Sequence, residues 1–212
     1  DIAVSRGLGD VYKRQELYEL GINIGSKIKE DVEVAFLNID INIAPVIDGI
    51  LYAQYKFNDY KSADDLAMNK ITFNNEDTTE NNIKQSSIFW VRNQINTPAL
   101  DKSPEEFIQN VNNLVESSDV NVEVFDQKWL EENNFGGVLG VAKGSDRAPY
   151  LVVGKYNEKA KYQISLIGKG VLFDSGGYSL KSPAGMETMK TDMSGAASAW
   201  GVINLVARTN QD

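Results

Sequence analysis

Charged side chains gather among glycines in residues 168–198, GKGVLFDSGGYSLKSPAGMETMKTDMSGAAS. Asp174 follows the apolar run Val-Leu-Phe and precedes Ser-Gly-Gly. A carboxylate in that setting suits a ligand held at the floor of a cleft, because glycine tolerates the positive φ of a sharp turn. Lys169, Lys181 and Asp192 lie in the same segment. Carboxylates are ligands for hard divalent cations, and an ammonium group stabilises developing negative charge. These residue types are typical of metal-assisted or electrostatic chemistry.

The chain of 212 residues contains no histidine and no cysteine. Their absence excludes Ser-His-Asp and Cys-His nucleophile systems, histidine zinc sites, thiolate metal sites and disulfides. Any metal must be held by oxygen atoms or by a lysine nitrogen. The net charge of −9 argues against nucleic acid as a partner. No apolar run approaches the roughly 20 residues of a membrane helix, so we expect no membrane partner. With no export signal and no cysteine, a cytoplasmic location is the default.

Each of these charged residues also has an ordinary structural interpretation. Lys169 could be a lysine at a strand end that extends its ammonium to water. Asp174 could be a turn residue, and Asp192 could be a plain helix N-cap. Lys181 and Lys190 could be surface lysines. Taken one at a time, the residues do not decide between these alternatives and a functional site.

The elements that must position these residues alternate between helix and strand. Apolar periodicity predicts helices at 16–30, 43–57, 83–95, 104–116, 126–133 and 192–208. It predicts strands at 32–39, 70–73, 121–125, 149–156 and 161–169. Continuous apolar strands are typical of an α/β layered sheet, and we expect 161–169 to be a central strand. Ligand sites in such sheets lie beyond the carboxyl ends of strands, which is where the charged segment begins.

The chain is predicted to fall into three parts. Residues 1–15 include DVYKRQ, which is the translation of a transposon-type sequencing adaptor, so we expect them to be an adaptor artefact on a piece of a longer reading frame. The polar cluster at 74–82 is the predicted linker, with a turn at Gly136-Gly137 further on. The expected domains are therefore 16–82 and 83–212.

The ordered string of residues closely resembles the signature of the leucyl aminopeptidases, the dimetal cytosol aminopeptidases of peptidase family M17. The matching residues are GKG at 168–170, FDSGG at 173–177, SLK at 179–181, Met186, MK at 189–190, DM at 192–193 and GAA at 195–197. Upstream, RNQINTPA at 92–99 is similar to the start of the family's catalytic domain. The resemblance covers about 16–212. It implies the end of an α/β N-terminal domain followed by an incomplete, three-layer, mixed-sheet α/β catalytic domain.

The resemblance also implies a role for individual residues. Asp174 would bridge two divalent metal ions, Mn²⁺ or Zn²⁺, and Lys169 and Asp192 would both bind one and the same of these ions. Lysine ligates only as the neutral amine, so the pKa of Lys169 would have to be lowered. Lys181 would be the catalytic residue that polarises the scissile carbonyl and stabilises the oxyanion. Met189 would line the substrate-binding pocket for the N-terminal side chain.

The chain departs from the family pattern in three respects. Tyr178 and Ser194 replace the usual residues at positions that are not proposed ligands. The family's downstream acidic motif, which completes both metal sites and helps to hold a bicarbonate, does not occur in the sequence. Two aspartates and one lysine are too few donors for two divalent ions. We therefore expect a fragment with little or no activity of its own.

The predicted function of the parent protein is release of N-terminal amino acids, with a leucine-like preference, from peptide substrates by water activated at two metals. The family implies a homo-oligomer, a hexamer in the full-length parent. The alternative is a non-catalytic structural or binding relative on the same fold. A phosphate or nucleotide binder is disfavoured, because neither glycine-rich phosphate-loop pattern occurs in the sequence.

Overall fold

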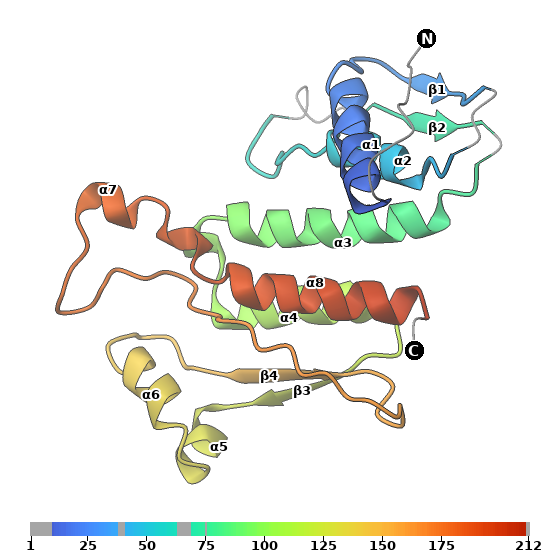
Figure 1. Cartoon of the computed structure of the whole chain (residues 1–212). Helices are drawn as coiled ribbons and strands as arrows, with labels where there is room; N and C mark the ends of the chain where they lie inside the picture. Colours follow the sequence, from blue (N-terminus) through green and yellow to red (C-terminus); the bar gives the residue numbers. More distant parts are fainter. Residues whose placement is uncertain (1–9, 38–40, 63–68, 75, 211–212) are drawn as a thin grey trace. The chain divides into compact units, whose positions relative to one another are not determined.

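The computed structural model describes residues 10–37, 41–62, 69–74 and 76–210, and the chain divides into two compact units between Ser86 and Ser87 (Figure 1). Helices and strands alternate in both units, which confirms the predicted α/β class. No helix in the described part of the chain is long and apolar enough to cross a membrane.

The first unit contains two helices and one pair of short strands. Helix α1 (Asp10–Gly25) packs on α2 (Ala44–Tyr52), and β1 (Val32–Val34) pairs in parallel with β2 (Ile71–Phe73). The two helix backbones meet closely, since a Cβ on Gly49 would lie 2.1 Å from the Tyr18 carbonyl oxygen. The helix predicted at 16–30 is α1, which begins and ends earlier than expected. Residues 38–39 of the predicted strand 32–39 lie outside the described residues.

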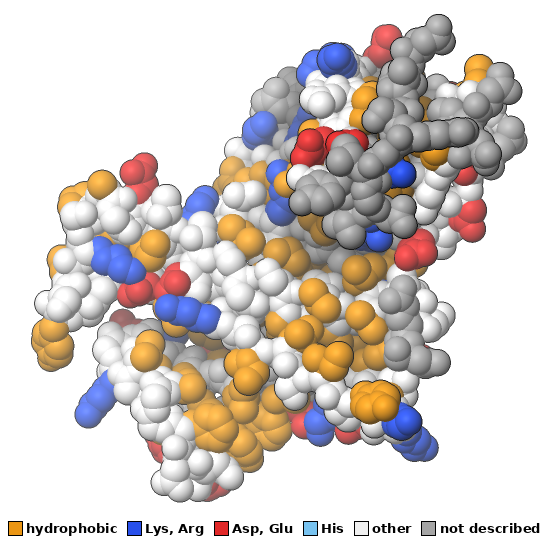
Figure 2. All heavy atoms as spheres, in the orientation of Figure 1, with side chains coloured by type: hydrophobic (Ala, Val, Ile, Leu, Met, Phe, Trp, Pro, Cys, Tyr) orange, Lys and Arg blue, Asp and Glu red, His pale blue; other side chains and the backbone are white. Residues whose placement is uncertain are grey.

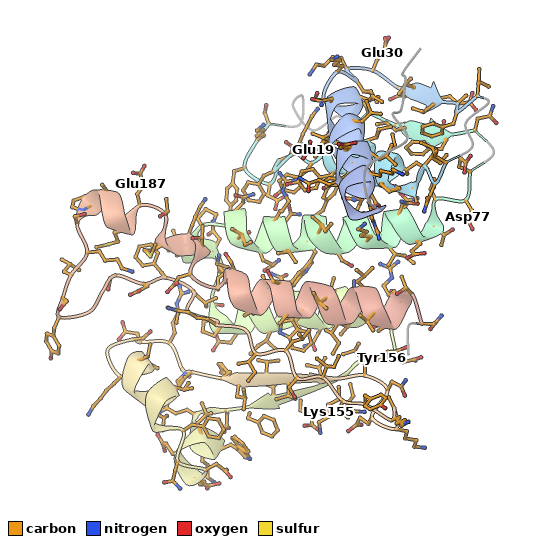
Figure 3. The ribbon with its side chains drawn as sticks, in the orientation of Figure 1. Glu19, Glu30, Asp77, Lys155, Tyr156 and Glu187 are labelled. Carbon is orange, nitrogen blue, oxygen red and sulfur yellow. The ribbon has the colours of Figure 1, made fainter. Side chains whose placement is uncertain are left out.

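The second unit contains most of the helices. Helix α3 begins in the first unit and ends in the second. The helices are α3 (Thr79–Asn96), η2 (Ala99–Asp101), α4 (Pro104–Val115), α5 (Gln127–Glu132), α6 (Gly136–Ala142), α7 (Pro183–Met186), η3 (Met189–Thr191) and α8 (Ser194–Arg208). Strand β3 (Asn121–Phe125) pairs antiparallel with β4 (Leu151–Lys155). An ion pair of 2.8 Å between Lys155 Nζ and Glu123 Oε1 joins the two strands, and Figure 3 shows Lys155 at the end of β4.

The core of the second unit lies where α4 and α8 meet. Its buried members are Phe107, Val111, Val115, Met193, Ala197 and Trp200. Side chains of α3 and of both strands pack against this cluster, so that helices cover one face of the strand pair (Figure 1). The start of α4 is a complete capping box: Glu106 N–H donates to Ser103 Oγ, and Ser103 N–H donates to the Glu106 carboxylate. This core holds Met193 and the first turn of α8, which begins two residues after Asp192.

The predicted central strand at 161–169 is wrong. No residue of this segment pairs with a strand in the described part of the chain, and its apolar side chains are open to solvent, with Ile164 86% and Ile167 97% exposed. Figure 2 shows apolar side chains open on the face that carries α8 and the two strands. An apolar pattern indicates a strand but contains no information on whether a neighbouring strand is present to receive its backbone hydrogen bonds.

Two other expectations differ from the structure. Helix α3 begins at Thr79, inside the predicted linker 74–82, since polar residues at a helix start do not prevent helix formation. The predicted turn at Gly136-Gly137 is the first turn of α6, in which a Cβ on either glycine would meet nothing within 4 Å. Glycine permits turns but does not require them.

Candidate metal and catalytic site

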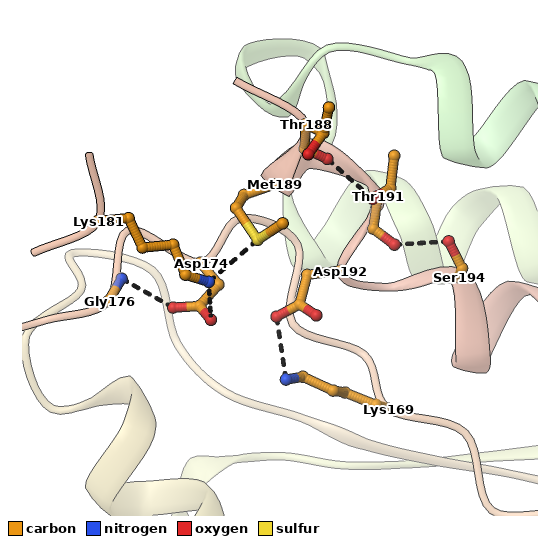
Figure 4. Close-up of polar contacts among 9 residues, drawn as sticks. All are labelled: Lys169, Asp174, Gly176, Lys181, Thr188, Met189, Thr191, Asp192 and Ser194. Atoms are coloured by element: carbon orange, nitrogen blue, oxygen red, sulfur yellow. Dashed lines mark hydrogen bonds and ion pairs between the residues drawn. The ribbon is translucent and has the colours of Figure 1, made fainter. Parts of the chain in front are cut away.

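Asp174 and Lys181 form the shorter of the two ion pairs drawn in Figure 4. Lys181 Nζ donates to Asp174 Oδ2 at 2.6 Å, and Gly176 N–H donates to Asp174 Oδ1 at 2.8 Å. The hydrogen bond from Lys181, followed by that from Gly176, lowers the pKa of the Asp174 carboxyl below its ordinary value. Asp174 is thus an ionised carboxylate at neutral pH, which is the form that a cation requires.

A glycine turn brings these two residues together. Gly176 has φ +93°, and a Cβ there would lie 2.3 Å from the Ser179 carbonyl oxygen, so only glycine fits. Lys181 N–H donates to the Ser175 carbonyl at 2.9 Å and closes the turn. Asp174 is therefore a turn residue, as the ordinary interpretation held, and its second carboxylate oxygen still faces Lys181.

Met189 lies on the other side of the Lys181 ammonium. Met189 Sδ is 3.0 Å from Lys181 Nζ, although the two residues belong to η3 and to the loop before α7. The structure thus brings together three of the predicted site residues, Asp174, Lys181 and Met189. Glu187, the C-cap residue of α7, extends outward from the chain in Figure 3.

Lys169 and Asp192 form the second pair of the site. Lys169 Nζ is 3.0 Å from Asp192 Oδ2, and the lysine side chain is 59% exposed while the aspartate side chain is 21% exposed. The N-cap interpretation of Asp192 is wrong, because the N-cap of α8 is Met193 and no side chain caps that helix. Asp192 Oδ2 is buried and has no partner with hydrogen-bond geometry. The carboxylate therefore faces Lys169 with unused capacity to accept.

Close backbone packing fixes Lys169 beside the start of α8. Ala196 N–H donates to the Lys169 carbonyl oxygen at 2.9 Å. A Cβ on Gly168 would lie 2.5 Å from Ala196 Cα and from the Gly195 carbonyl oxygen. Glycine at 168 therefore allows the chain to approach α8 closely enough for the Lys169 side chain to reach Asp192.

The donor set fits one part of a site for divalent cations. Asp174 and Asp192 supply carboxylate oxygens, one of them buried without a hydrogen-bond partner, and Lys169 supplies a nitrogen. In the described part of the chain, no group of three or more acidic side chains is gathered as a complete metal shell. Two carboxylates and a lysine match the chemistry of a hard or borderline dication but leave its coordination incomplete.

Two lysines make backbone hydrogen bonds around this site, and the sequence assigned neither of them a site role. Lys190, whose ordinary interpretation was a surface lysine, is half-buried and donates to the Asn96 carbonyl oxygen at 2.8 Å. Lys102 is 1% exposed and donates to three backbone carbonyl oxygens. Lysine is rarely buried, so composition and periodicity gave no signal for either residue.

The sequence of the chain matches a known protein family. Residues 89–212, more than half of the chain, match the model of the cytosol aminopeptidase family, catalytic domain. A protein of Wolbachia pipientis, described as a "Probable cytosol aminopeptidase", is 36% identical over 95% of this chain and 44% of its own length. Peptidase B of Yersinia pestis is 43% identical over 57% of this chain and 29% of its own length.

Solved structures agree with the sequence comparison. The crystal structure of the cytosol aminopeptidase from Coxiella burnetii matches 91% of this chain and 43% of that chain, with a TM-score of 0.79 and 29% identity. The bottromycin maturation enzyme BotP in complex with Mn has the same fold, with a TM-score of 0.77 and 21% identity over 93% of this chain and 45% of that chain. The chain spans less than half the length of the Wolbachia protein and of both solved chains. On these grounds the chain belongs to the cytosol aminopeptidase family, and residues 89–212 are part of that family's catalytic domain.

Proposed function

We propose that residues 168–194 form part of the centre of a metal-dependent aminopeptidase that releases N-terminal amino acids, with a leucine-like preference, from peptides. The observation that carries the proposal is the convergence of Asp174, Lys181 and Met189 in one cluster, with Lys169 and Asp192 paired in the same segment. Family membership supports the peptidase activity. The use of metals, the substrate preference and the role of each residue go beyond family membership and are what we propose.

In this proposal, the side chains divide into metal ligands and substrate-directed groups. Asp174 has two oxygens, one facing Lys181 and one facing the Gly176 amide, and would be shared between two cations. Lys169 and Asp192 would together hold one of the two ions. When bound, divalent ions would supply water of lowered pKa and would polarise the peptide carbonyl. Mn²⁺ is the first ion to test, because BotP, whose fold this chain shares, is seen with Mn.

Lys181 would act on the substrate rather than as a ligand. Its amino nitrogen lies 2.6 Å from the Asp174 carboxylate and 3.0 Å from the Met189 thioether. A fixed positive charge stabilises the negative charge that develops on a carbonyl oxygen, and removal of such a donor typically lowers kcat by about 100-fold or more. Met189 would contact the substrate's N-terminal side chain beside that ammonium.

The test is a chimera in which residues 89–212 replace the corresponding part of the Coxiella aminopeptidase. We expect Mn²⁺-dependent hydrolysis of leucine p-nitroanilide, and a Lys181→Met chimera about 100-fold slower that retains its bound Mn²⁺. A folded chimera that binds Mn²⁺ but is inactive would support the non-catalytic alternative. For the 212-residue chain alone, we expect turnover no higher than background.

The remaining expectations rest on the family resemblance. They are peptide substrates, a cytoplasmic location, assembly of the parent as a hexamer, and a bicarbonate that assists proton transfer there. Gel filtration and light scattering of the parent would test the assembly.

A further inference from the structure

The ammonium group of Lys102 is buried within a set of backbone carbonyls. Its Nζ donates to the carbonyl oxygens of Gln94 at 2.7 Å, Thr97 at 3.2 Å and Lys190 at 3.0 Å, and the residue is 1% exposed. An ammonium has three N–H donors, and all three are used on carbonyl oxygens. Lys102 therefore joins two segments that are 88 residues apart in the chain.

Two of the three carbonyls lie at the end of α3. The last carbonyl oxygens of a helix have no partner within the helix, and the negative end of the helix dipole favours a cation there. Gln94 is in the final turn of α3, and Thr97 follows its last residue. Lys102 thus acts as a side-chain cap for α3 while its third hydrogen bond is directed to η3.

Lys190 makes the reciprocal connection. Its own Nζ donates to the Asn96 carbonyl oxygen, while its backbone carbonyl accepts from Lys102. Hydrogen bonds from two lysine side chains therefore connect the end of α3 to the segment 189–192. That segment carries Met189, which touches Lys181, and Asp192, which faces Lys169.

We propose that Lys102 and Lys190 form a clamp that fastens segment 189–192 to the end of α3 and so sets the positions of Met189 and Asp192. Lys102 is then a positioning residue for the candidate site, and its importance for catalysis rests on the proposed function. The four hydrogen bonds of the clamp all go to backbone carbonyl oxygens, so the clamp acts through the backbone of 189–192.

The cost of burying the Lys102 amino group indicates that this residue does more than fill space in the core. Burial and the nearby charge of Lys190 lower the pKa of Lys102 to about 8. A leucine would fill similar space without the cost of a buried charge. A leucine could not donate hydrogen bonds, so it could not hold carbonyl oxygens of two separate segments in one geometry. The cost of the buried amine is therefore offset by three hydrogen bonds that define where η3 lies.

The experiment compares Lys102→Leu with Lys143→Leu in the 212-residue chain. Lys143 is an exposed lysine at the end of α6 and serves as the matched control. Backbone amide exchange is measured by NMR for Thr191 and Asp192, whose N–H groups donate to Thr188 and Met189, and for the β3–β4 amides as a global reference. The ¹³C-methyl signals of Met189 and Met193 provide a second readout, because Met193 is fully buried in the core.

In Lys102→Leu, we expect the Thr191 and Asp192 amides to exchange about 10-fold faster, with the β3–β4 amides unchanged. The Met189 methyl signal should shift while that of Met193 stays in place, and Lys143→Leu should change neither. Lys190→Met, which removes only the hydrogen bond to Asn96, should give the same pattern with a smaller change. If Lys102→Leu is too unstable for NMR, this milder variant decides the question in the same way.

Two results would overturn the clamp: uniform acceleration of all amides, or local exchange and a Met189 signal equal to those of the unaltered chain. Neither readout requires a metal. Failure of Mn²⁺ to bind the unaltered chain would count against the proposed function alone, since the exchange data would still decide whether Lys102 holds segment 189–192.

Discussion

At the scale of single residues, two lysines have different surroundings and different proposed roles. Lys181 donates to the Asp174 carboxylate in the candidate site. Lys102 is buried among backbone carbonyl oxygens, and its burial lowers its pKa. Each lysine therefore gives a prediction of its own.

Lys181→Met should leave Mn²⁺ binding by the chain unchanged or make it tighter. Lys181 Nζ is paired with Asp174 Oδ2 at 2.6 Å, and removal of that amino group frees the oxygen for a cation. Isothermal titration of both proteins with Mn²⁺ at one pH measures the change, with Lys128→Met, a mostly exposed lysine, as the control. Weaker binding by Lys181→Met would mean that Lys181 is itself a ligand.

The stability advantage of the unaltered chain over Lys102→Leu should grow as the pH is raised from 7 to 10. The pKa of Lys102 is about 8 in the folded chain, lowered mainly by burial, and ordinary in the unfolded chain. Between those two pKa values the unfolded chain binds more protons, so the free energy of unfolding rises with pH. Below pH 8 both states are protonated and the burial penalty is fully present.

Denaturant titrations of both proteins at pH 7 and at pH 9.5 test this prediction. Most other titrating groups are common to the two proteins, so their contributions largely cancel in the difference between the two free energies of unfolding. A difference that shrinks with rising pH would show that the folded chain favours the charged form of Lys102.

At the scale of elements, the start of α8 and the segment before it must approach closely for Lys169 to meet Asp192. Gly168→Ala should lower the free energy of unfolding by about 1–3 kcal/mol, because its Cβ would lie 2.5 Å from Ala196 Cα and the Gly195 carbonyl oxygen. It should also separate Lys169 from Asp192. Thermal or denaturant unfolding followed by circular dichroism measures the change in stability.

Gly140→Ala is the matched control for this prediction. Gly140 lies in α6, and a Cβ there would meet nothing within 4 Å. Alanine stabilises a helix by up to about 1 kcal/mol relative to glycine, so this variant should be no less stable than the unaltered chain. Equal effects of the two substitutions would refute the close approach at Gly168.

Elements with a local cause were predictable from the sequence. Helix α4 and strands β3 and β4 appear where the pattern placed them, because apolar periodicity and alternation are encoded in adjacent residues. The strand predicted at 161–169 does not form, because a strand needs a partner strand that the segment itself does not specify. The pairing of Lys181 with Asp174 depends on the Gly176 turn, and the clamp of Lys102 depends on contacts 88 residues apart, which no spacing rule indicates.

At the scale of the whole molecule, the chain exposes an apolar stretch that a stable monomer seldom leaves open. Ile164, Leu166 and Ile167 are 86%, 53% and 97% exposed. Contiguous exposed apolar surface promotes association. We therefore expect the purified chain to bind the dye ANS and to self-associate with rising concentration.

Ile167→Lys should reduce both effects without lowering the free energy of unfolding, since the side chain of Ile167 is almost fully exposed and contributes little burial. Sedimentation velocity over a range of concentrations measures the self-association, and Lys143→Leu provides a control in which apolar surface is added. A monomeric chain that binds no ANS would contradict the expectation.

The central claim is that Asp174 and Asp192 face one site for divalent cations. The most direct measurement is paramagnetic broadening of the NMR signals of the 212-residue chain by Mn²⁺. We predict selective broadening of the amide signals of 174–177 and 192–194, with the β3–β4 amides unaffected, and loss of the effect in the Asp174→Asn/Asp192→Asn double variant. Broadening centred elsewhere, or broadening that persists in the double variant, would contradict the account.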